Sequence, residues 1–426
     1  MIAKKNIDVA IIGGGPGGLA TAITLSELPF MSVTLYEQNP EPREAGAGIS
    51  LSTNAWRVLD LLGAGNRVKG GSKQDTHQRN AYTGSILSIT RHPEHSDADN
   101  RGAIRARRTR LQSALLSRVP DDVICFNKKV VAIEDVQTGG VRLLFQDETE
   151  ATADIVVGAD GIKSIVRRAV FPDHQLHFTG NVAWRTLVPR TALAHLPDVT
   201  HATAWWWGED GHVYFSDVDD ESETDNPYFE ITVRSYHEPE IQGQTVVWSI
   251  PATNERVRSR CTKFDKRVRD AIGTVPEGQW REFAGFAGPR LDAIVGWDKV
   301  VLIGDASHPL SGAFGSGATF AMEDAWILAR ALERTQQSPS QVRDALAIFD
   351  AIRSPYYARM YEHLDDAGVK IKKSKAEAKD FDEALRAKIN YFLLGDKDFI
   401  YKNDIARIWS DYVAAQQSRG DGVEAD

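Results

Sequence analysis

The stretch "IDVAIIGGGPGGLATAITLSELPFMSVTLYEQNP", residues 7–40, predicts a strand, a glycine-rich turn, a helix and a second strand. Its first part, Ile7 to Ile12, is a continuous apolar and largely β-branched run, which is typical of a buried parallel strand. The helix is expected from about Pro16 to Leu28, and the second strand from Ser32 to Tyr36. This order predicts an α/β fold built on a parallel sheet.

The turn carries the G-x-G-x-x-G pattern of dinucleotide-binding folds. Gly13 permits the tight turn, Gly15 lets a pyrophosphate approach the backbone, and Gly18 lets the helix pack closely on the strand. Pro16 begins the helix, whose free N–H groups point at the phosphates. Glu37 lies 19 residues beyond Gly18, where an acidic side chain accepts hydrogen bonds from a ribose 2′-OH. These residues predict FAD or NAD rather than NADP at this site, and they leave the choice between FAD and NAD open.

Two segments far downstream repeat the change from a buried strand to a glycine-containing turn. The stretch "ATADIVVGADGIKSIVRRAVF", 151–171, predicts a strand, a Gly-Ala-Asp-Gly turn and a helix. The run "KVVLIGDAS", 299–307, predicts another buried strand and leads into "GDASHPLSGAFGSGATFAMED", 304–324. A chain that already has one phosphate-binding turn therefore has a second loop of small residues just before a predicted helix.

The pattern between 172 and 285 is different. Alternating segments such as "GHVYFSDV" and "PYFEITVRSYH" are separated by Gly, Pro and Asp clusters, and they predict antiparallel strands with one buried face. Helices are expected after this region, at 317–334, about 340–363, 376–394 and 403–416. A length of 426 residues fits two domains, or one large domain with an inserted layer.

Composition narrows the class of protein further. The net charge of −9 argues against a nucleic-acid partner, which normally requires a basic face. No stretch approaches the roughly 20 apolar residues that a membrane-spanning helix needs. Cys125 and Cys261 are too few for a disulfide framework and have no metal-ligand spacing, so no metal site is expected. We therefore expect a cytoplasmic protein without a membrane or nucleic-acid partner.

Three segments together resemble the flavin-binding motifs of one family. The segments "GGGPGGLA", "DIVVGADGIKSIVR" and "VVLIGDASHPLSGAFGSGATFAMEDA" are similar, in order and spacing, to those of the single-component FAD-dependent aromatic hydroxylases. The stretches "GAGISLSTNAWRVLDLLG", "RRTRLQSAL" and "GNVAWRTLVP" resemble the salicylate hydroxylase-like branch of that family. The resemblance covers roughly residues 7–360.

The resemblance implies a Rossmann-type FAD-binding domain with an inserted, mostly antiparallel β-sheet substrate domain and C-terminal helices. The expected FAD-binding parts are 1–75, 106–171 and 286–365. The remaining parts are a substrate-side segment (76–105), the β-sheet substrate domain (172–285), the C-terminal helices (366–416) and a disordered tail (417–426).

The same resemblance assigns further cofactor contacts. It implies that Asp305 binds a ribityl hydroxyl and that the helix beginning near Gly317 points its N-terminus at the flavin. Gly315 and Ala318 flank that helix start. Arg108 matches an arginine that contacts FAD, and Asp160 belongs to the middle motif near the pyrophosphate. Bacterial members usually have a proline and an aromatic residue at the place of Gly312 and Ala313, and this departure leaves the geometry of the substrate open.

The implied activity is that of an FAD-dependent monooxygenase. NADH or NADPH would reduce FAD as a transient reductant, and O₂ would then form a flavin C4a-hydroperoxide. That species would hydroxylate an aromatic acid or phenol, with loss of a carboxyl group where hydroxylation is ipso to it. The protein has to orient the ring, activate a phenol and exclude water.

The inserted sheet is expected to lie over the flavin and to contact the substrate. Arg185 and Arg234 are candidates for holding a carboxylate. His212 and Tyr214 share one strand face and suit a pair that activates a phenol, although an exposed His and a packing Tyr give the same pattern. Arg185, His212 and Tyr214 are the predicted catalytic residues. The run "AWWWG", 204–208, is expected to pack in the core or at an interface.

Three alternatives remain at this point. Within the same fold, the protein is a flavin epoxidase or hydroxylase of a polyketide or terpenoid intermediate. Outside that activity, it is an NAD-dependent dehydrogenase, or a flavin-binding protein without turnover. The sequence also leaves open the exact substrate, the choice between NADH and NADPH, and whether the protein is a monomer or a homodimer.

Overall fold

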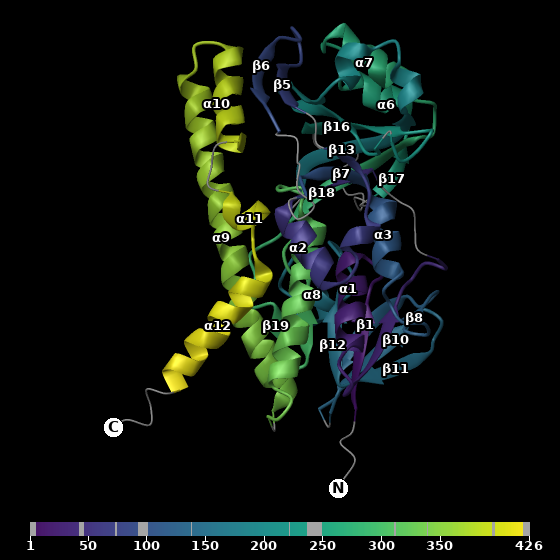
Figure 1. The fold of residues 1–426 in the computed structure, drawn as a ribbon, viewed down its shortest axis with the longest axis vertical. Coiled ribbons are helices and arrows are strands. Elements are labelled where there is room, and N and C mark those ends of the chain that lie inside the picture. The colour runs from purple at the N-terminus through teal and green to yellow at the C-terminus, as the bar shows by residue number, and fades with distance from the viewer. Residues whose placement is uncertain are drawn as a thin grey trace.

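A six-stranded sheet forms the centre of the lower half of the molecule (Figure 1). Its strand order is β19 (Val295–Gly296), β20 (Val300–Leu302), β12 (Ile155–Gly158), β1 (Ile7–Ile12), β2 (Met31–Tyr36) and β8 (Ile124–Cys125). All neighbouring strands are parallel except β19 and β20. The predicted first strand is confirmed, and the second begins one residue earlier than expected. This computed structural model describes residues 6–41, 47–72, 75–92, 101–137, 139–220, 222–236, 249–310, 312–338, 340–393 and 397–420.

Apolar cores cover both faces of this sheet. One core is shared with α1 (Pro16–Ser26), α2 (Thr53–Leu61), α3 (Arg108–Leu116) and α8 (Gly317–Arg334). The other is shared with α4 (Ile165–Val170) and a small sheet of β9 (Val130–Asp135), β10 (Val141–Phe145) and β11 (Glu150–Ala153). Within β1, Val9 and Ile11 enter the first core while Ala10 and Ile12 enter the second. Burial on both sides explains why this strand reads as one continuous apolar run.

An eight-stranded sheet lies above the first sheet in Figure 1. Its order is β17 (Ser249–Ala252), β18 (Trp280–Ala287), β13 (His177–Pro189), β16 (Tyr228–Tyr236), β15 (Gly211–Asp217), β14 (Thr203–Trp207), β5 (Thr76–Asn80) and β6 (Ile86–Thr90). Only β14 and β5 pair in parallel. The predicted fold class, a Rossmann-type domain with an inserted and mostly antiparallel sheet, is confirmed.

The two faces of the eight-stranded sheet differ in chemistry. The outer face is apolar and packs Trp184, Trp206 and Phe215 against α5 (Pro197–Thr200), α6 (Asn254–Ser259) and α7 (Lys266–Gly273). The inner face, toward the Rossmann-type domain, is buried but carries polar and aromatic side chains, among them Gln78, His212, Tyr214, Glu230 and Thr232. A buried surface with placed polar groups is typical of a ligand site rather than of a core.

A small third sheet joins the two halves. It consists of β3 (Gly48–Leu51), β7 (Ile104–Arg107) and β4 (Gly71–Ser72). Arg105 of β7 forms an ion pair with the fully buried Glu230 of the large sheet. Arg107 and Arg110 both pair with Asp219, which is also buried. These contacts fix the inner face of the large sheet over the Rossmann-type domain.

Four C-terminal helices run along one side of both halves (Figure 1). They are α9 (Gln341–Glu377), α10 (Phe381–Leu393), α11 (Asp398–Tyr401) and α12 (Ile405–Gly420). The first is longer than the predicted helix at 340–363. Its last turns are rich in the strong helix formers Ala, Lys and Glu, and Lys373 pairs with Glu377 one turn on. Among the described residues no helix is long and apolar enough to cross a membrane.

Some expected boundaries fall inside these elements. The boundary at 365 lies within α9, the one at 285 within β18, and the one at 105 within β7. The tail expected at 417–426 is helical as far as Gly420, because α12 continues to that residue. Residues 421–426 lie outside the part of the chain that the structure describes. The short helices at Gly65–Arg67, Arg190–Leu193 and Gly304–Ala306 are of the 3-10 type.

Candidate functional site

The first glycine turn has the geometry that its sequence predicts. Gly13 has a φ of +106°, and a Cβ atom there would lie 2.5 Å from the carbonyl oxygen of Ala159. A Cβ atom on Gly18 would lie 1.9 Å from the carbonyl oxygen of Gly13. By contrast, a Cβ atom on Gly15 would meet nothing within 4 Å, so space is open in front of the N-terminus of α1. Gly13 and Gly18 therefore serve packing, whereas Gly15 leaves room for a ligand.

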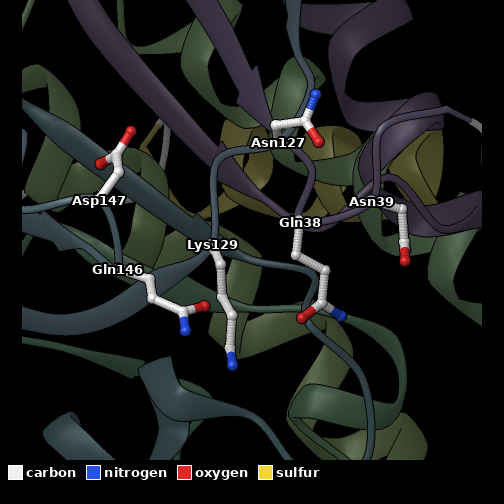
Figure 2. Close-up of a pocket in the computed structure, with 6 residues that line it drawn as sticks. All are labelled: Gln38, Asn39, Asn127, Lys129, Gln146 and Asp147. Carbon is white, nitrogen blue, oxygen red and sulfur yellow. The ribbon is translucent and has the colours of Figure 1, made fainter.

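Glu37 follows β2 and reaches back to this turn. Its carboxylate accepts a hydrogen bond from the backbone N–H of Gly14 at 2.7 Å and another from Asn39 at 2.9 Å. Next to it lies an open, polar pocket of about 400 Å³ (Figure 2), lined by Gln38, Asn39, Asn127, Lys129, Gln146 and Asp147. Amide and ammonium groups beside the expected ribose position are suited to hydrogen bonding with an adenosine group.

The middle motif lies beside the first turn. The Asp160 carboxylate accepts hydrogen bonds from the backbone N–H groups of Ile165 at 2.7 Å and Val166 at 3.3 Å. Its other oxygen is buried and has no partner among the described residues. Burial raises the pKa of Asp160. Arg167, which follows in α4, donates to the backbone carbonyls of Asp305 and Ala306 and so connects the middle motif to the third.

The third motif forms what we call the flavin loop, residues 304–316, of which Ser311 lies outside the described residues. Asp305 is exposed although its neighbours are buried. A Cβ atom on Gly317 would lie 3.4 Å from its carboxylate, which places Asp305 at the N-terminus of α8. Gly315 has a φ of +66° with open space around it, and Ala318 lies in the first turn of α8.

The predicted cofactor residues therefore lie in one row. Asp305, Asp160, Gly13 and Glu37 follow the carboxyl ends of β20, β12, β1 and β2, which are consecutive neighbours in the sheet. Ligands of open α/β sheets bind at this edge. The open space at Gly15 and Gly315 and the unpartnered oxygen of Asp160 fit an elongated dinucleotide such as FAD.

Arg108 begins α3 beside this row. Burial lowers the pKa of its guanidinium, while the nearby Asp305 carboxylate acts in the opposite direction and Arg185 adds to the lowering. Arg108 thus lies between the flavin loop and the inner face of the large sheet. Its role as an FAD contact stays a prediction.

Behind the flavin loop lies a buried charged network that the sequence did not reveal. Arg353 of α9 is fully buried and donates to Asp324 at 2.6 Å and to Glu323 at 3.3 Å. Asp324 also accepts from the backbone N–H of Gly304 at 2.9 Å and from the Tyr357 hydroxyl at 2.6 Å. Burial alone would raise the pKa of Asp324, but Arg353 lowers it to about 2. Burial raises the pKa of Glu323 to about 7 in spite of the same arginine.

His308 of the flavin loop also belongs to this network. Its ring stacks on Tyr357 with 3.6 Å between the ring centroids, and it lies 3.5 Å from Asp324. The His308 side chain is buried.

The departure at Gly312 has a structural reason. Gly312 has a φ of +70°, which a proline cannot adopt because its ring holds φ near −65°. The flavin loop of this chain therefore follows a backbone path that is incompatible with the usual proline. A Cβ atom on Gly312 would lie 3.6 Å from Nη2 of Arg234, so the loop and the large sheet approach each other here.

The predicted substrate residues share the inner face of the large sheet. Arg185 donates to Glu230 and to the Gly48 carbonyl, both at 2.9 Å. Arg234 is half-buried on the next strand, and none of the described residues pairs with its guanidinium. His212 and Tyr214 are buried on β15. The structure thus brings the two arginines, Arg185 and Arg234, onto the same face as His212 and Tyr214.

The "AWWWG" run divides between the two faces. Trp206 is fully buried in the outer core. Trp205 and Trp207 stack on the inner face with 5.3 Å between centroids. His212 lies 5.0 Å from the first and 4.7 Å from the second, and Tyr214 lies 4.7 Å from Trp205. The expected packing role holds for Trp206 in the outer core and for Trp207, which is buried in a smaller apolar cluster under α10. Trp205 and Trp207 also contact the candidate site.

The comparison with protein families identifies the class. A family model described as an FAD binding domain matches residues 6–362, which is most of the chain. The protein therefore belongs to this family of FAD-binding proteins. Among the described residues no group of three or more His, Cys, Asp or Glu side chains is arranged to hold a metal ion.

Characterised relatives narrow the class to aromatic monooxygenases. The chain is 29% identical over 374 residues to 3-amino-4-hydroxybenzoate 2-monooxygenase PtmB3 of Streptomyces platensis, covering 86% of this chain and 89% of the relative. It is 28% identical over 388 residues to a salicylate hydroxylase of Pseudomonas putida, covering 86% of each. The predicted class, an FAD-dependent aromatic monooxygenase, is confirmed, and the alternative of an NAD-dependent dehydrogenase is set aside.

Solved structures agree with the fold. A salicylate hydroxylase substrate complex superposes with a TM-score of 0.76 at 24% identity, covering 95% of this chain and 98% of that chain. CtdE in complex with FAD and a substrate superposes with a TM-score of 0.79 at 19% identity, covering 97% and 100%. The C-terminal helices are therefore part of the shared architecture.

Two glycine variants separate packing from cofactor binding. We expect Gly18→Ala to destabilise the protein by about 3 kcal/mol or more, because its methyl group collides with the Gly13 carbonyl. Gly15→Ala should keep the thermal stability of the FAD-free protein and weaken FAD binding by about tenfold or more. Thermal unfolding and FAD titration measure the two effects, and equal behaviour of the two variants would contradict this division.

Removal of the buried arginine should destabilise the flavin loop and the protein together. Arg353→Leu leaves Asp324 and Glu323 buried without a counter-ion, and we expect a loss of about 3–5 kcal/mol in the free energy of unfolding. The matched control is Arg343→Leu, an exposed arginine on the same helix, with an expected change within about 0.5 kcal/mol. Denaturant unfolding of both variants gives the comparison, and similar losses would show that the network carries no special stability.

Proposed function

We propose that the protein hydroxylates an aromatic acid and that Arg234 holds the carboxylate of that acid beside Gly312 of the flavin loop. The observation that supports this proposal is the environment of the Arg234 guanidinium. This group is half-buried, it lies 3.6 Å from the position of a Cβ atom on Gly312, and none of the described residues pairs with it. A desolvated cation without a counter-ion is costly, and an anionic substrate would offset that cost.

The charges around Arg234 support an anionic ligand. Burial lowers the pKa of its guanidinium, and Arg185 adds to the lowering against an opposite effect of Tyr236. Arg234 and Arg185 are therefore close enough to repel each other. A carboxylate between the sheet and the flavin loop would relieve this repulsion.

Arg185 has a different environment from Arg234. Glu230 already neutralises it, and the same carboxylate pairs with Arg105. Its side chain is still 28% exposed, so it can approach a ligand from the side. We assign Arg185 to positioning the inner face and the carboxylate site, and Arg234 to the direct contact.

His212 and Tyr214 are suited to handling a phenol. Burial lowers the pKa of His212 well below its ordinary value, and Arg234 and Lys388 lower it further. The imidazole is therefore neutral at pH 7 and able to accept a proton or a hydrogen bond. Burial raises the pKa of Tyr214, so its hydroxyl stays protonated and can donate. We propose that this pair orients and activates a ring hydroxyl of the substrate.

Bound FAD, reduced by NADH or NADPH, supplies the oxygen-transfer chemistry of this class. The protein would contribute the row of residues that hold FAD, the flavin loop that would place the flavin ring next to the inner face of the large sheet, and a buried environment. The polar inner face orients the acid, and the aromatic rings on it exclude water.

The first test uses the FAD-loaded protein with NADH or NADPH and a panel of phenols with and without a carboxyl group. We expect one or more phenolic acids to accelerate nicotinamide oxidation and to yield an oxygenated product, with or without loss of CO₂, by mass spectrometry. Stimulation by none of them, together with turnover of a larger polyketide or terpenoid, would replace this proposal with the epoxidase or hydroxylase alternative.

Variants then test the carboxylate contact. Arg234→Gln should raise KM for phenolic acids by about 10- to 100-fold, because it removes a charge-assisted hydrogen bond, and it should change KM for neutral phenols much less. Arg258→Gln is the matched control, since that exposed arginine lies on α6 over the outer face. Equal effects of Arg234→Gln on acids and neutral phenols would refute the assignment.

A further inference from the structure

The inner face of the large sheet extends beyond the Arg234 region to a second covered area. Helix α10 lies alongside β5 and β6 (Figure 1) and buries Leu385 and Ile389 against Leu87 and Trp207. Arg386 donates to the Leu87 carbonyl at 2.6 Å, and Asn80 donates to Asp382 at 2.5 Å. The helix is thus attached to β5 and β6, next to Trp207 of β14.

Lys388 extends from this helix toward the inner face. Its ammonium nitrogen lies over the Trp207 ring, 4.6 Å from the centroid, and its side chain is half-buried. Two lysines of the C-terminal region have carboxylate partners one turn away, since Lys373 pairs with Glu377 and Lys402 with Asp398. No described residue gives Lys388 such a partner. Burial lowers its pKa, and repulsion from Lys375 lowers it further.

His212 connects Lys388 with Arg234. The His212 ring contacts Trp207 at 4.7 Å between centroids, and Trp207 carries the Lys388 ammonium on its face. On the neighbouring strand, Arg234 is paired in register with His212. Both cations act on the same imidazole. The inner face therefore has two cations that none of the described carboxylates pairs with, Arg234 near the flavin loop and Lys388 on α10, on either side of one neutral histidine.

We propose that the substrate carries a second acidic group, and that Lys388 binds this group against Trp207 while Arg234 binds the first. This inference rests on the proposed function and specifies its substrate class as an aromatic acid with two anionic groups, the simplest being a hydroxylated aromatic dicarboxylate. A cation over an indole is attracted by the negative face of the ring. None of the described residues accepts a hydrogen bond from the Lys388 ammonium, and a carboxylate of the substrate would accept from its N–H groups.

The aromatic stack beside Lys388 also fits such a substrate. Trp205 and Trp207 are nearly parallel, with an interplanar angle of 9°, and they stack on each other next to His212. A planar aromatic ring packs well against the face of such a stack. The two cations would then bind substituents at the two ends of the substrate ring. The positions of these substituents would determine which ring carbon faces the flavin loop.

The test compares ligands and variants on the FAD-loaded protein. The probes are salicylate, with one carboxylate, and 4-hydroxyisophthalate and 2-hydroxyterephthalate, with two. Binding is measured by the change in flavin absorbance, and turnover by NADH or NADPH oxidation. We expect at least one diacid to bind about tenfold or more tightly than salicylate.

Lys388→Met should remove this preference while it retains the length of the side chain. We expect the Kd of the preferred diacid to rise by about tenfold or more relative to that of salicylate, and Lys388→Arg to restore part of the preference. The matched control is Lys372→Met, an exposed lysine on α9, which should leave the ratio of the two Kd values unchanged. Thermal unfolding of each variant shows whether loss of the Trp207 contact alone explains a change.

The outcomes separate this inference from the function that it specifies. If monoacids are hydroxylated and Lys388→Met leaves the ratio of diacid to monoacid affinity unchanged, the second site is refuted and the proposed function stands. If no phenolic acid of either kind binds or is hydroxylated, the proposed function fails. A lower melting temperature for Lys388→Met with an unchanged ratio assigns the lysine to packing and also refutes the second site.

Discussion

The structure depends on the buried carboxylate of Asp324. It accepts hydrogen bonds from the backbone of Gly304, from Arg353 and from Tyr357, and so joins the end of β20, the helix α8 and the helix α9 at one point. Such a network is stable only while every member is paired, because removal of one partner leaves a buried charge. The flavin loop therefore begins from a fixed position, and the C-terminal helices are attached to the same point.

The second constraint is the difference between the two faces of the large sheet. Apolar burial of Trp184 and Trp206 on the outer face stabilises the sheet, which leaves the inner face available for polar groups. That face would be unstable without partners, and Arg105, Arg107 and Arg110 of the Rossmann-type half provide them for Glu230 and Asp219. None of the described residues forms such a pair with Arg234, and there we propose that the substrate binds.

The sequence predicted those parts of the molecule that depend on local backbone geometry. Gly13 and Gly18 are required by contacts within one strand, turn and helix, so their spacing in the chain is sufficient to identify them. The Arg353 network and the pairing of Arg185 with Glu230 join elements that are distant in sequence, and a single chain gives no periodic signal for such contacts. The same reason explains why the sequence favours Arg185 over Arg234, whereas the neighbours of the two side chains favour Arg234 for the direct contact that we propose.

The residues that we propose to select the substrate lie partly outside the strongest family motifs. The family match ends at residue 362, but Lys388 in α10 and Tyr401 in α11 both lie beyond it. Tyr401 donates to the Phe314 carbonyl of the flavin loop at 3.1 Å, and α10 covers the inner face at Trp207. The loop itself has a glycine at 312 with a φ that excludes proline. The C-terminal helices thus contact both the flavin loop and the inner face, so under our proposal these helices and position 312 are where a different aromatic acid would be selected.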